Sequence, residues 1–167
     1  MIIILTQCFP SRIGGIENLV SNLALGLGKK EKVIVFADRH HLFYDAIYDN
    51  QYKDQIIVRR TGGLKFFRRR KKIRELKPFI ESNQVKLVIA DTWKSLELSI
   101  DLLDKKNIST ICLVHGNELL SNNEKKIQRI VQILNRASSI IANSQFTVNL
   151  VKKLLANKEH IKFVYPG

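Results

Sequence analysis

The residues best suited to chemistry in this 167-residue chain lie at the ends of short apolar segments. Gly14 and Gly15 stand between an apolar segment at residues 2–5 and a helical apolar pattern at residues 16–27. The first turn of a helix carries unpaired backbone N–H groups and a partial positive charge. Because two glycines let an anion approach that backbone closely, the pair predicts a phosphate site, although a tight turn would also use it.

His115 follows the apolar segment at residues 110–114 and precedes Gly116, so we expect its imidazole to face a crevice. A tryptophan ring beside charged groups suits the apolar face and the hydroxyls of a sugar. Polar residues after three such segments are therefore candidates for binding a sugar or an acceptor: Asp91, Trp93, Lys94, Glu118, Asn143 and Ser144. Simpler roles stay open, since Glu118 and Ser144 can also cap the helices that follow them.

The net charge of +13 is concentrated in one segment. Residues 59–77 hold ten basic side chains and one acidic one, so they carry +9 of that charge. This segment predicts binding to an anionic membrane surface, where each Lys or Arg contributes about 1 kcal/mol. The predicted patch includes aromatic residues that can enter the interface, and comprises Phe66, Phe67, Arg68, Arg69, Arg70, Lys71 and Lys72. A solvated helix face is the alternative, and nucleic acid is disfavoured because no nucleic-acid-binding motif accompanies the charge.

The elements that must position these residues alternate along the chain. Apolar segments predict strands at residues 2–5, 32–37, 55–59, 87–90, 110–114, 139–142 and 161–164. Helices are predicted at residues 16–27, from about 68 to 83, and at 96–105, 123–135 and 144–155. We expect Pro78 to kink or divide the second helix, and residues 38–54 to form a long loop with at most one helical turn.

Continuous apolar strands joined by helices predict an α/β fold. We expect one Rossmann-like, doubly wound domain, with a mostly parallel sheet and helices on both of its faces. Ligands of such sheets bind at the carboxyl ends of the strands, which is where the candidate residues stand.

Several other classes of protein receive little support. No apolar run approaches the roughly 18 residues of a membrane span, and we expect a cytoplasmic chain with Cys8 and Cys112 as free thiols. His40 and His41 lack the partners of a metal site. A dinucleotide-dependent oxidoreductase stays open, since Asp38 ends the second strand, although the chain lacks a GxGxxG motif. A non-enzymatic adaptor that binds membrane or RNA is a further alternative.

Four segments together resemble the N-terminal domain of family 4 glycosyltransferases, which have the GT-B fold. They are FPSRIGGIENLVSNLALGL with KVIVFA, LVIADTWKS, ICLVHGNEL, and RASSIIANSQFTVNLV with IKFVYPG. The closing motif reads Tyr165-Pro166-Gly167, without the asparagine that is usual in that family. The resemblance implies that residues 1–167 form the acceptor-side half of a GT-B fold. We expect the C-terminal, donor-binding domain to be absent from this chain, which is then either a fragment or truncated product or is completed by a separate subunit.

The resemblance also implies an activity. It is retaining transfer of a hexosyl group from a nucleotide-sugar to a saccharide or lipid-linked acceptor, as in cell envelope polysaccharide synthesis, without a metal or a cofactor. Gly14 and Gly15 would approach the donor diphosphate, and His115 would contact the transferred sugar. The basic patch would hold the chain peripherally on the inner face of the cytoplasmic membrane. Because a leaving diphosphate needs positive groups on both sides, we expect this chain alone to bind donor weakly and not to turn over.

Overall fold

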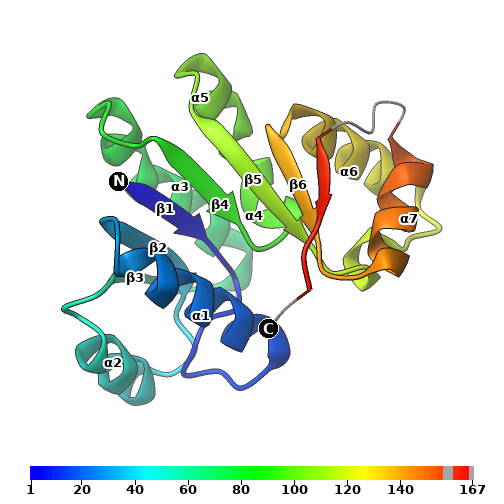
Figure 1. Ribbon diagram of the computed structural model, residues 1–167. Helices are drawn as coiled ribbons and strands as arrows, with labels where there is room; N and C mark the ends of the chain where they lie inside the picture. Colours follow the sequence, from blue (N-terminus) through cyan, green and yellow to red (C-terminus); the bar gives the residue numbers. More distant parts are fainter. Residues whose placement is uncertain (156–159, 166–167) are drawn as a thin grey trace.

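The computed structural model describes residues 1–155 and 160–165, and of residues 65 and 66 it describes the backbone alone. Seven parallel strands form one sheet in the order β3-β2-β1-β4-β5-β6-β7, flanked by helices (Figure 1). In chain order the elements are β1 (Ile2–Leu5), α1 (Gly15–Gly28), β2 (Val33–Asp38), α2 (Leu42–Gln51), β3 (Ile57–Thr61), α3 (Lys65–Glu81), β4 (Leu87–Ala90), α4 (Trp93–Glu97), α5 (Ile100–Lys105), β5 (Ser109–Val114), the 3-10 turn η1 (Asn117–Leu119), α6 (Glu124–Arg136), β6 (Ser139–Ala142), α7 (Gln145–Leu154) and β7 (Ile161–Phe163). The predicted Rossmann-like α/β fold is confirmed.

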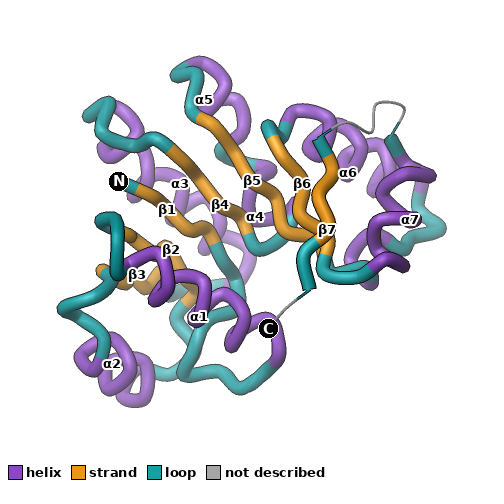
Figure 2. Tube along the Cα trace, in the orientation of Figure 1, coloured by secondary structure: helices purple, strands orange, loops and turns teal. Residues whose placement is uncertain are grey.

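The two faces of the sheet carry separate apolar cores. Successive side chains of a strand point to opposite faces, so a strand buried on both faces is apolar throughout. Ile3 and Leu5 of β1 pack into the core beneath α3, α4, α6 and α7. Ile2 and Ile4 pack into the core beneath α1. Figure 2 shows the same division, with α1 and α2 on one face and the remaining helices on the other.

Strand β1 lies at the centre of the sheet, between β2 and β4. Its last residue, Leu5, pairs with Phe36 of β2 and Ala90 of β4. The chain leaves β1 for β2 on one side and reaches β4 on the other, so the strand order reverses at β1. Loops that leave the carboxyl ends of such strands diverge and form a crevice, which places the candidate residues at one edge of the sheet.

Residues 38–54 do not form the predicted loop, because they contain α2. This helix escaped detection because it lacks an apolar periodicity: it exposes Leu42, Phe43 and Tyr44, and it buries Asp45. Its start is defined by His41, whose Nδ1 accepts a hydrogen bond from Tyr44 N at 3.4 Å. The loop prediction is wrong for this segment.

Two helix predictions also need correction. Helix α3 runs through Pro78 without being divided, and it begins at Lys65. The single helix predicted at residues 96–105 is instead two short helices, α4 and α5, joined at Ser99, whose Oγ donates to Leu96 O at 2.8 Å. None of the described helices is long and apolar enough to cross a bilayer.

Candidate functional site

A cavity of about 550 Å³ lies between α1 and the carboxyl ends of β5 and β6. Gly15, His115 and Asn143 line it together, with Asn18 and Asn22 on the wall formed by α1. The structure thus brings Gly15 and His115 to the same cavity, as the carboxyl-edge rule for parallel sheets predicts. Its described lining contains polar neutral groups but no Lys, Arg, Asp or Glu side chain.

Gly14 and Gly15 differ in what surrounds them. A Cβ placed on Gly15 would meet nothing within 4 Å, so the backbone at the first residue of α1 is open to a ligand. A Cβ on Gly14 would lie 2.2 Å from Glu17 Oε2. The Glu17 carboxylate is buried, stands near the positive N-terminal end of α1 and pairs with Arg12 at 3.0 Å. Close approach of this carboxylate explains the glycine at position 14, and Gly15 is the one of the pair that lines the cavity.

His115 is held by backbone contacts. Its Nε2 lies 2.9 Å from Asp91 O, and because a carbonyl oxygen only accepts, Nε2 carries the hydrogen. Its backbone N–H donates to Glu118 Oε1 at 2.7 Å. The following residue, Gly116, has φ 103, which favours glycine, and this turn brings the Glu118 side chain back to His115. Glu118 therefore positions the histidine.

Asn143 and Ser144 follow β6 but have different surroundings. Asn143 lines the cavity, and its Oδ1 accepts from Thr147 Oγ1 at 3.1 Å. Ser144 caps α7, because its Oγ accepts from Thr147 N at 3.1 Å. The helix cap is the alternative that sequence reasoning had left open for Ser144, and the structure supplies its geometry.

Asp91 is buried and accepts hydrogen bonds from the loop after β1. Its Oδ2 accepts from Thr6 Oγ1 at 2.7 Å and from Gln7 N at 3.1 Å, and its Oδ1 accepts from Ser95 Oγ at 2.5 Å. Burial raises the pKa of the Asp91 carboxyl, and these hydrogen bonds oppose that shift. The carboxylate thus joins the ends of β1 and β4 and lies too deep to meet an acceptor directly.

Trp93 does not form a sugar platform. Its side chain is 1% exposed and belongs to the apolar core beneath α4 and α6, so the prediction of a tryptophan at the lip of the crevice is wrong. The end-of-strand position led to that prediction, but α4 begins at Trp93 and turns the ring inward. Lys94 and Arg129 lie over the outer part of this ring, at 5.7 and 5.6 Å from its centroid.

An apolar groove of about 350 Å³ continues from the same cavity along the sheet. Leu19, Leu23, His115 and Asn143 line both spaces. The remaining wall is built mainly from apolar side chains of α1 and of strands β4 to β6.

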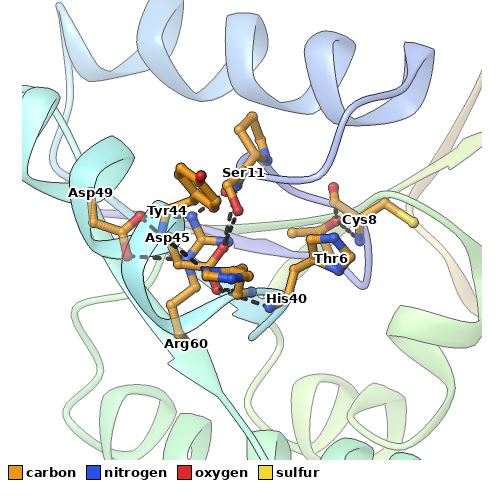
Figure 3. Close-up of polar contacts among 10 residues, drawn as sticks. Thr6, Cys8, Ser11, His40, Tyr44, Asp45, Asp49 and Arg60 are labelled. Carbon is orange, nitrogen blue, oxygen red and sulfur yellow. Dashed lines mark hydrogen bonds and ion pairs between the residues drawn. The ribbon is translucent and has the colours of Figure 1, made fainter.

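Sequence reasoning missed a buried ion-pair cluster that holds the β1–α1 loop in place (Figure 3). Asp45, on α2, is 2% exposed and accepts hydrogen bonds from Ser11 Oγ at 2.8 Å and His40 N at 2.8 Å. Arg60, on β3, lies 3.6 Å from Asp45, pairs with Asp49 at 2.7 Å and donates to Pro10 O. The cluster therefore ties the loop that precedes Gly15 to two neighbouring elements. The only sequence signal was an acid in a segment without apolar periodicity.

The Asp45 carboxyl is kept ionised by this cluster. Burial alone would raise the pKa of Asp45, but hydrogen bonds from His40 N and Ser11 and the charge of Arg60 lower it below its ordinary value. A buried carboxylate surrounded by donors stabilises the fold while it is charged.

Some residues of the predicted membrane patch are buried in the structure and others are exposed. Lys72 is 5% exposed, pairs with Asp38 at 2.6 Å and donates to Thr6 O, so it faces inward. Arg68 pairs with Asp38 at 3.4 Å, and Arg69 with Glu97 at 2.6 Å. Of the predicted residues, Phe67, Arg70 and Lys71 are exposed, and the Phe66 side chain lies outside the described part. Arg59 and Arg74 extend the exposed basic surface.

The pairing of Asp38 with two basic residues bears on the oxidoreductase alternative. A ribose-binding carboxylate must accept hydrogen bonds from the sugar hydroxyls, whereas Asp38 is engaged by Lys72 and Arg68. Within residues 1–155 and 160–165, no group of three or more His, Cys, Asp or Glu side chains is placed to hold a metal ion.

This chain is similar to a known protein family and to several solved structures. A family model described as Glycosyltransferase Family 4 matches residues 13–167. HepE (Alr3699) of Anabaena, solved with UDP and glucose, superposes with a TM-score of 0.74 at 19% identity, over 99% of this chain and 44% of that one. WaaB, a lipopolysaccharide outer core galactosyltransferase, gives 0.67 at 15% identity, over 99% and 45%. Among curated protein sequences, none matches.

A third solved structure, UDP-GlcNAc 2-epimerase of Methanocaldococcus jannaschii, gives a TM-score of 0.65 at 14% identity, over 98% of this chain and 45% of that one. The chain spans less than half the length of these proteins. Because an epimerase and glycosyltransferases share the architecture, the structural likeness shows the fold, and the family model carries the assignment to a class.

Proposed function

Because the chain belongs to glycosyltransferase family 4, we propose that it forms the acceptor-side half of an enzyme that transfers a hexosyl group from a nucleotide-sugar. The acceptor in this proposal is a saccharide or a lipid-linked saccharide. The observation that supports it most is that Gly15 and His115 line one cavity at the carboxyl edge of the sheet. That edge is where parallel α/β sheets bind their ligands.

We assign the donor diphosphate to the N-terminus of α1 at Gly15, where there is open space and where the first backbone N–H groups of a helix lack partners within the helix. His115 is assigned to the transferred sugar, because Nε2 is fixed on Asp91 O and Nδ1 remains to accept from a sugar hydroxyl. In retaining transfer the bond from the anomeric carbon to the diphosphate oxygen breaks, and the acceptor oxygen bonds to the anomeric carbon on the same face. The proton of the acceptor hydroxyl passes to the departing diphosphate. This proposal requires neither a metal nor a cofactor.

The cavity supplies only part of the charge that the reaction needs. A departing diphosphate develops negative charge, and its stabilisation depends on positive groups aimed at it. The helix terminus provides about half a positive charge, and no described Lys or Arg lines the cavity. We therefore propose that a donor-binding half, on the same or a separate polypeptide, supplies the remaining cations.

The exposed part of the basic surface supports a peripheral position on an anionic membrane, at the inner face of the cytoplasmic membrane. Lys71 and Arg74 are exposed on α3, and Arg59 is exposed on the neighbouring β3. Each such charge contributes about 1 kcal/mol near an anionic lipid surface, so a few of them suffice for reversible attachment. This position would suit an enzyme of cell envelope polysaccharide synthesis that acts on lipid-linked acceptors.

Calorimetric titration with UDP-glucose tests the proposed donor site. The probe is chosen because UDP and glucose are bound in the HepE structure. We expect Gly15→Ala to weaken binding about tenfold, equivalent to 1.4 kcal/mol, because its methyl group would enter the cavity. Gly26→Ala is the matched control, since Gly26 lies in the same helix and its Cβ would also meet nothing within 4 Å. Equal affinities for the two variants would contradict the assignment, and so would a full-affinity His115→Ala variant.

A further inference from the structure

A second cavity, of about 320 Å³, lies at the carboxyl ends of β1 and β2, beside the N-terminal part of α3. Among the described residues, none lines both this cavity and the cavity at Gly15. Four arginines line it: Arg12, Arg39, Arg68 and Arg69. Asp38 is the carboxylate among its described lining residues. We call this space the arginine cavity. We infer that it is a separate ligand site, which binds an anionic group, a phosphate or a carboxylate.

The charges at this cavity are only partly neutralised. Asp38 lies between two cations, since it pairs with Lys72 at 2.6 Å and with Arg68 at 3.4 Å. Arg12 pairs with Glu17 at 3.0 Å, and Arg69 pairs with Glu97 at 2.6 Å. Asp91 also interacts with Lys72, and Glu97 also pairs with Arg129. Four carboxylates therefore stand beside four arginines and two further cations, Lys72 and Arg129, so positive charge remains for a ligand.

Arg39 carries much of this remaining charge. Its side chain is exposed and makes no ion pair within the part of the chain that the structure describes. Its guanidinium lies against Gly62, where a Cβ would be 3.5 Å from Arg39 Nη1. Neighbouring His40 also lines the cavity. A cation held at the edge of a cavity by backbone packing is placed to meet an incoming anion.

Two buried donors lack an acceptor. Gln7 Nε2 and Arg68 Nε are both shielded from solvent, and neither finds a hydrogen-bond acceptor among the described residues. Both residues line this cavity. Buried polar groups are nearly always hydrogen-bonded, so each of these donors would gain by finding an acceptor. Because both N–H groups are shielded from solvent, each side chain must turn towards the cavity before it donates to a bound phosphate or carboxylate oxygen.

The chemistry of the donors selects the class of ligand. Guanidinium groups match the geometry of phosphate and carboxylate oxygens and can bind them with two parallel hydrogen bonds. A neutral hydroxyl would leave the surplus charge unpaired. Cys8, which also lines the cavity, contributes no negative charge at neutral pH, because burial and nearby carboxylates raise its pKa to about 11.

The two cavities are linked by one loop. The loop after β1 supplies Gln7 and Arg12 to the arginine cavity, and α1 begins directly after it at Gly15. A ligand anchored here lies next to the proposed donor site, so we assign the anion to the acceptor substrate. That assignment rests on the proposed function, whereas the presence of an anion site does not.

Nuclear magnetic resonance of the ¹⁵N-labelled chain tests the site directly. Inorganic phosphate and glucuronate are titrated, with glucose as the neutral control, and the Nε resonance of Arg68 and the side-chain amide of Gln7 are followed. We expect saturable shifts of both signals with the two anions and none with glucose. Arg39→Gln and Arg68→Gln should each weaken phosphate binding about tenfold, because each removes a charged hydrogen bond.

Lys71→Gln and Arg74→Gln are the matched controls, since they remove the same charge from exposed positions of α3 that do not line the cavity. The site is refuted if all four variants weaken phosphate binding equally, or if neither anion gives a saturable shift. Arg39→Gln, being exposed, keeps the test valid if Arg68→Gln fails to fold. Phosphatidylglycerol vesicles distinguish the sources: loss of vesicle binding in Arg39→Gln assigns the anion to a lipid headgroup, and retention assigns it to a soluble acceptor. UDP-glucose affinity is measured separately and bears on the donor site alone.

Discussion

The two adjacent glycines at the start of α1 should respond differently to the same substitution. Gly14→Ala places a methyl group 2.2 Å from Glu17 Oε2, so the buried carboxylate must move and its pair with Arg12 is disturbed. We expect a loss of about 1–2 kcal/mol in the free energy of unfolding. Gly15→Ala meets open space and should change it by less than about 1 kcal/mol. Urea denaturation of both variants measures this, and a larger loss for Gly15→Ala would contradict the described packing.

Asp45 should make the stability of the chain sensitive to acid. Its pKa is lowered in the folded state, so its contribution is present above the unfolded value of about 3.9 and is lost as the pH falls through the lower folded value. Asp45→Asn should therefore be less stable at pH 7, and its stability should fall less steeply below about pH 4 than that of the wild type. Denaturation midpoints measured from pH 7 down to the acid transition check this. If the stability of the two proteins varies with pH in the same way, the Asp45 carboxylate does not stabilise the folded chain as described.

At the scale of single residues, one rule found part of the site. The carboxyl ends of parallel strands led to Gly15, His115 and Asn143, because backbone topology alone decides which residues reach that edge. The same rule selected Trp93, whose ring turns into the core, since position at a strand end does not determine side-chain direction. Arg60 was counted only as one charge of the basic segment at residues 59–77, because a run of basic residues does not reveal which of them meets a buried acid.

Among the elements, the strands were the most predictable and α2 the least. Strands buried on both faces consist of unbroken apolar residues, as in β1 and β4. Helix α2 instead buries Asp45, packs Tyr48 against the core and leaves Leu42, Phe43 and Tyr44 exposed. Its position is fixed by an ion pair with β3, a long-range contact that local patterns do not contain.

The attachment of α2 to β3 gives a prediction with an internal control. Arg60 and Arg59 are neighbours on β3, but Arg60 has a buried pair with Asp45 and Asp49, while Arg59 lies over the Phe79 ring at 4.9 Å. Removing one partner of a buried ion pair costs about 3–5 kcal/mol. We expect Arg60→Gln to lose about that amount, and Arg59→Gln less than about 1 kcal/mol. Thermal or urea unfolding measures the stability of both variants, and similar losses would show that Arg60 does not hold α2 on β3.

Substitutions on α3 should separate effects on membrane binding from effects on stability. Lys71→Gln combined with Arg74→Gln removes two exposed charges, so binding to phosphatidylglycerol vesicles should fall by about 2 kcal/mol, roughly thirtyfold, with stability unchanged. Lys72→Met should instead lower stability by about 3 kcal/mol, because it leaves Asp38 without its nearest cation. Vesicle sedimentation and denaturation report the two effects. Unchanged vesicle binding in the double variant would remove the support for a membrane surface.

For the whole molecule, we propose that the described chain builds one wall of a site. The cavity proposed for the donor has a helix terminus and neutral side chains, and Arg12, Arg39, Arg68 and Arg69 line a different cavity. Residues 1–167 alone should therefore bind UDP-glucose no more tightly than about millimolar, a binding free energy near −4 kcal/mol, and should transfer no sugar. An assay of UDP release with saccharide acceptors measures this. Turnover at an ordinary transferase rate, about 1 s⁻¹ or more, would contradict it.

The position of the sugar in the cavity is the most direct test of the central claim, that the start of α1 and His115 face one sugar-diphosphate site. Intermolecular nuclear Overhauser effects can be recorded between UDP-glucose and the labelled chain. The account predicts contacts from the glucosyl protons to the His115 ring and the Asn143 side chain, with the Gly15 amide shifting on binding. Contacts confined to Gln7, Arg39 and the other residues of the arginine cavity would contradict it.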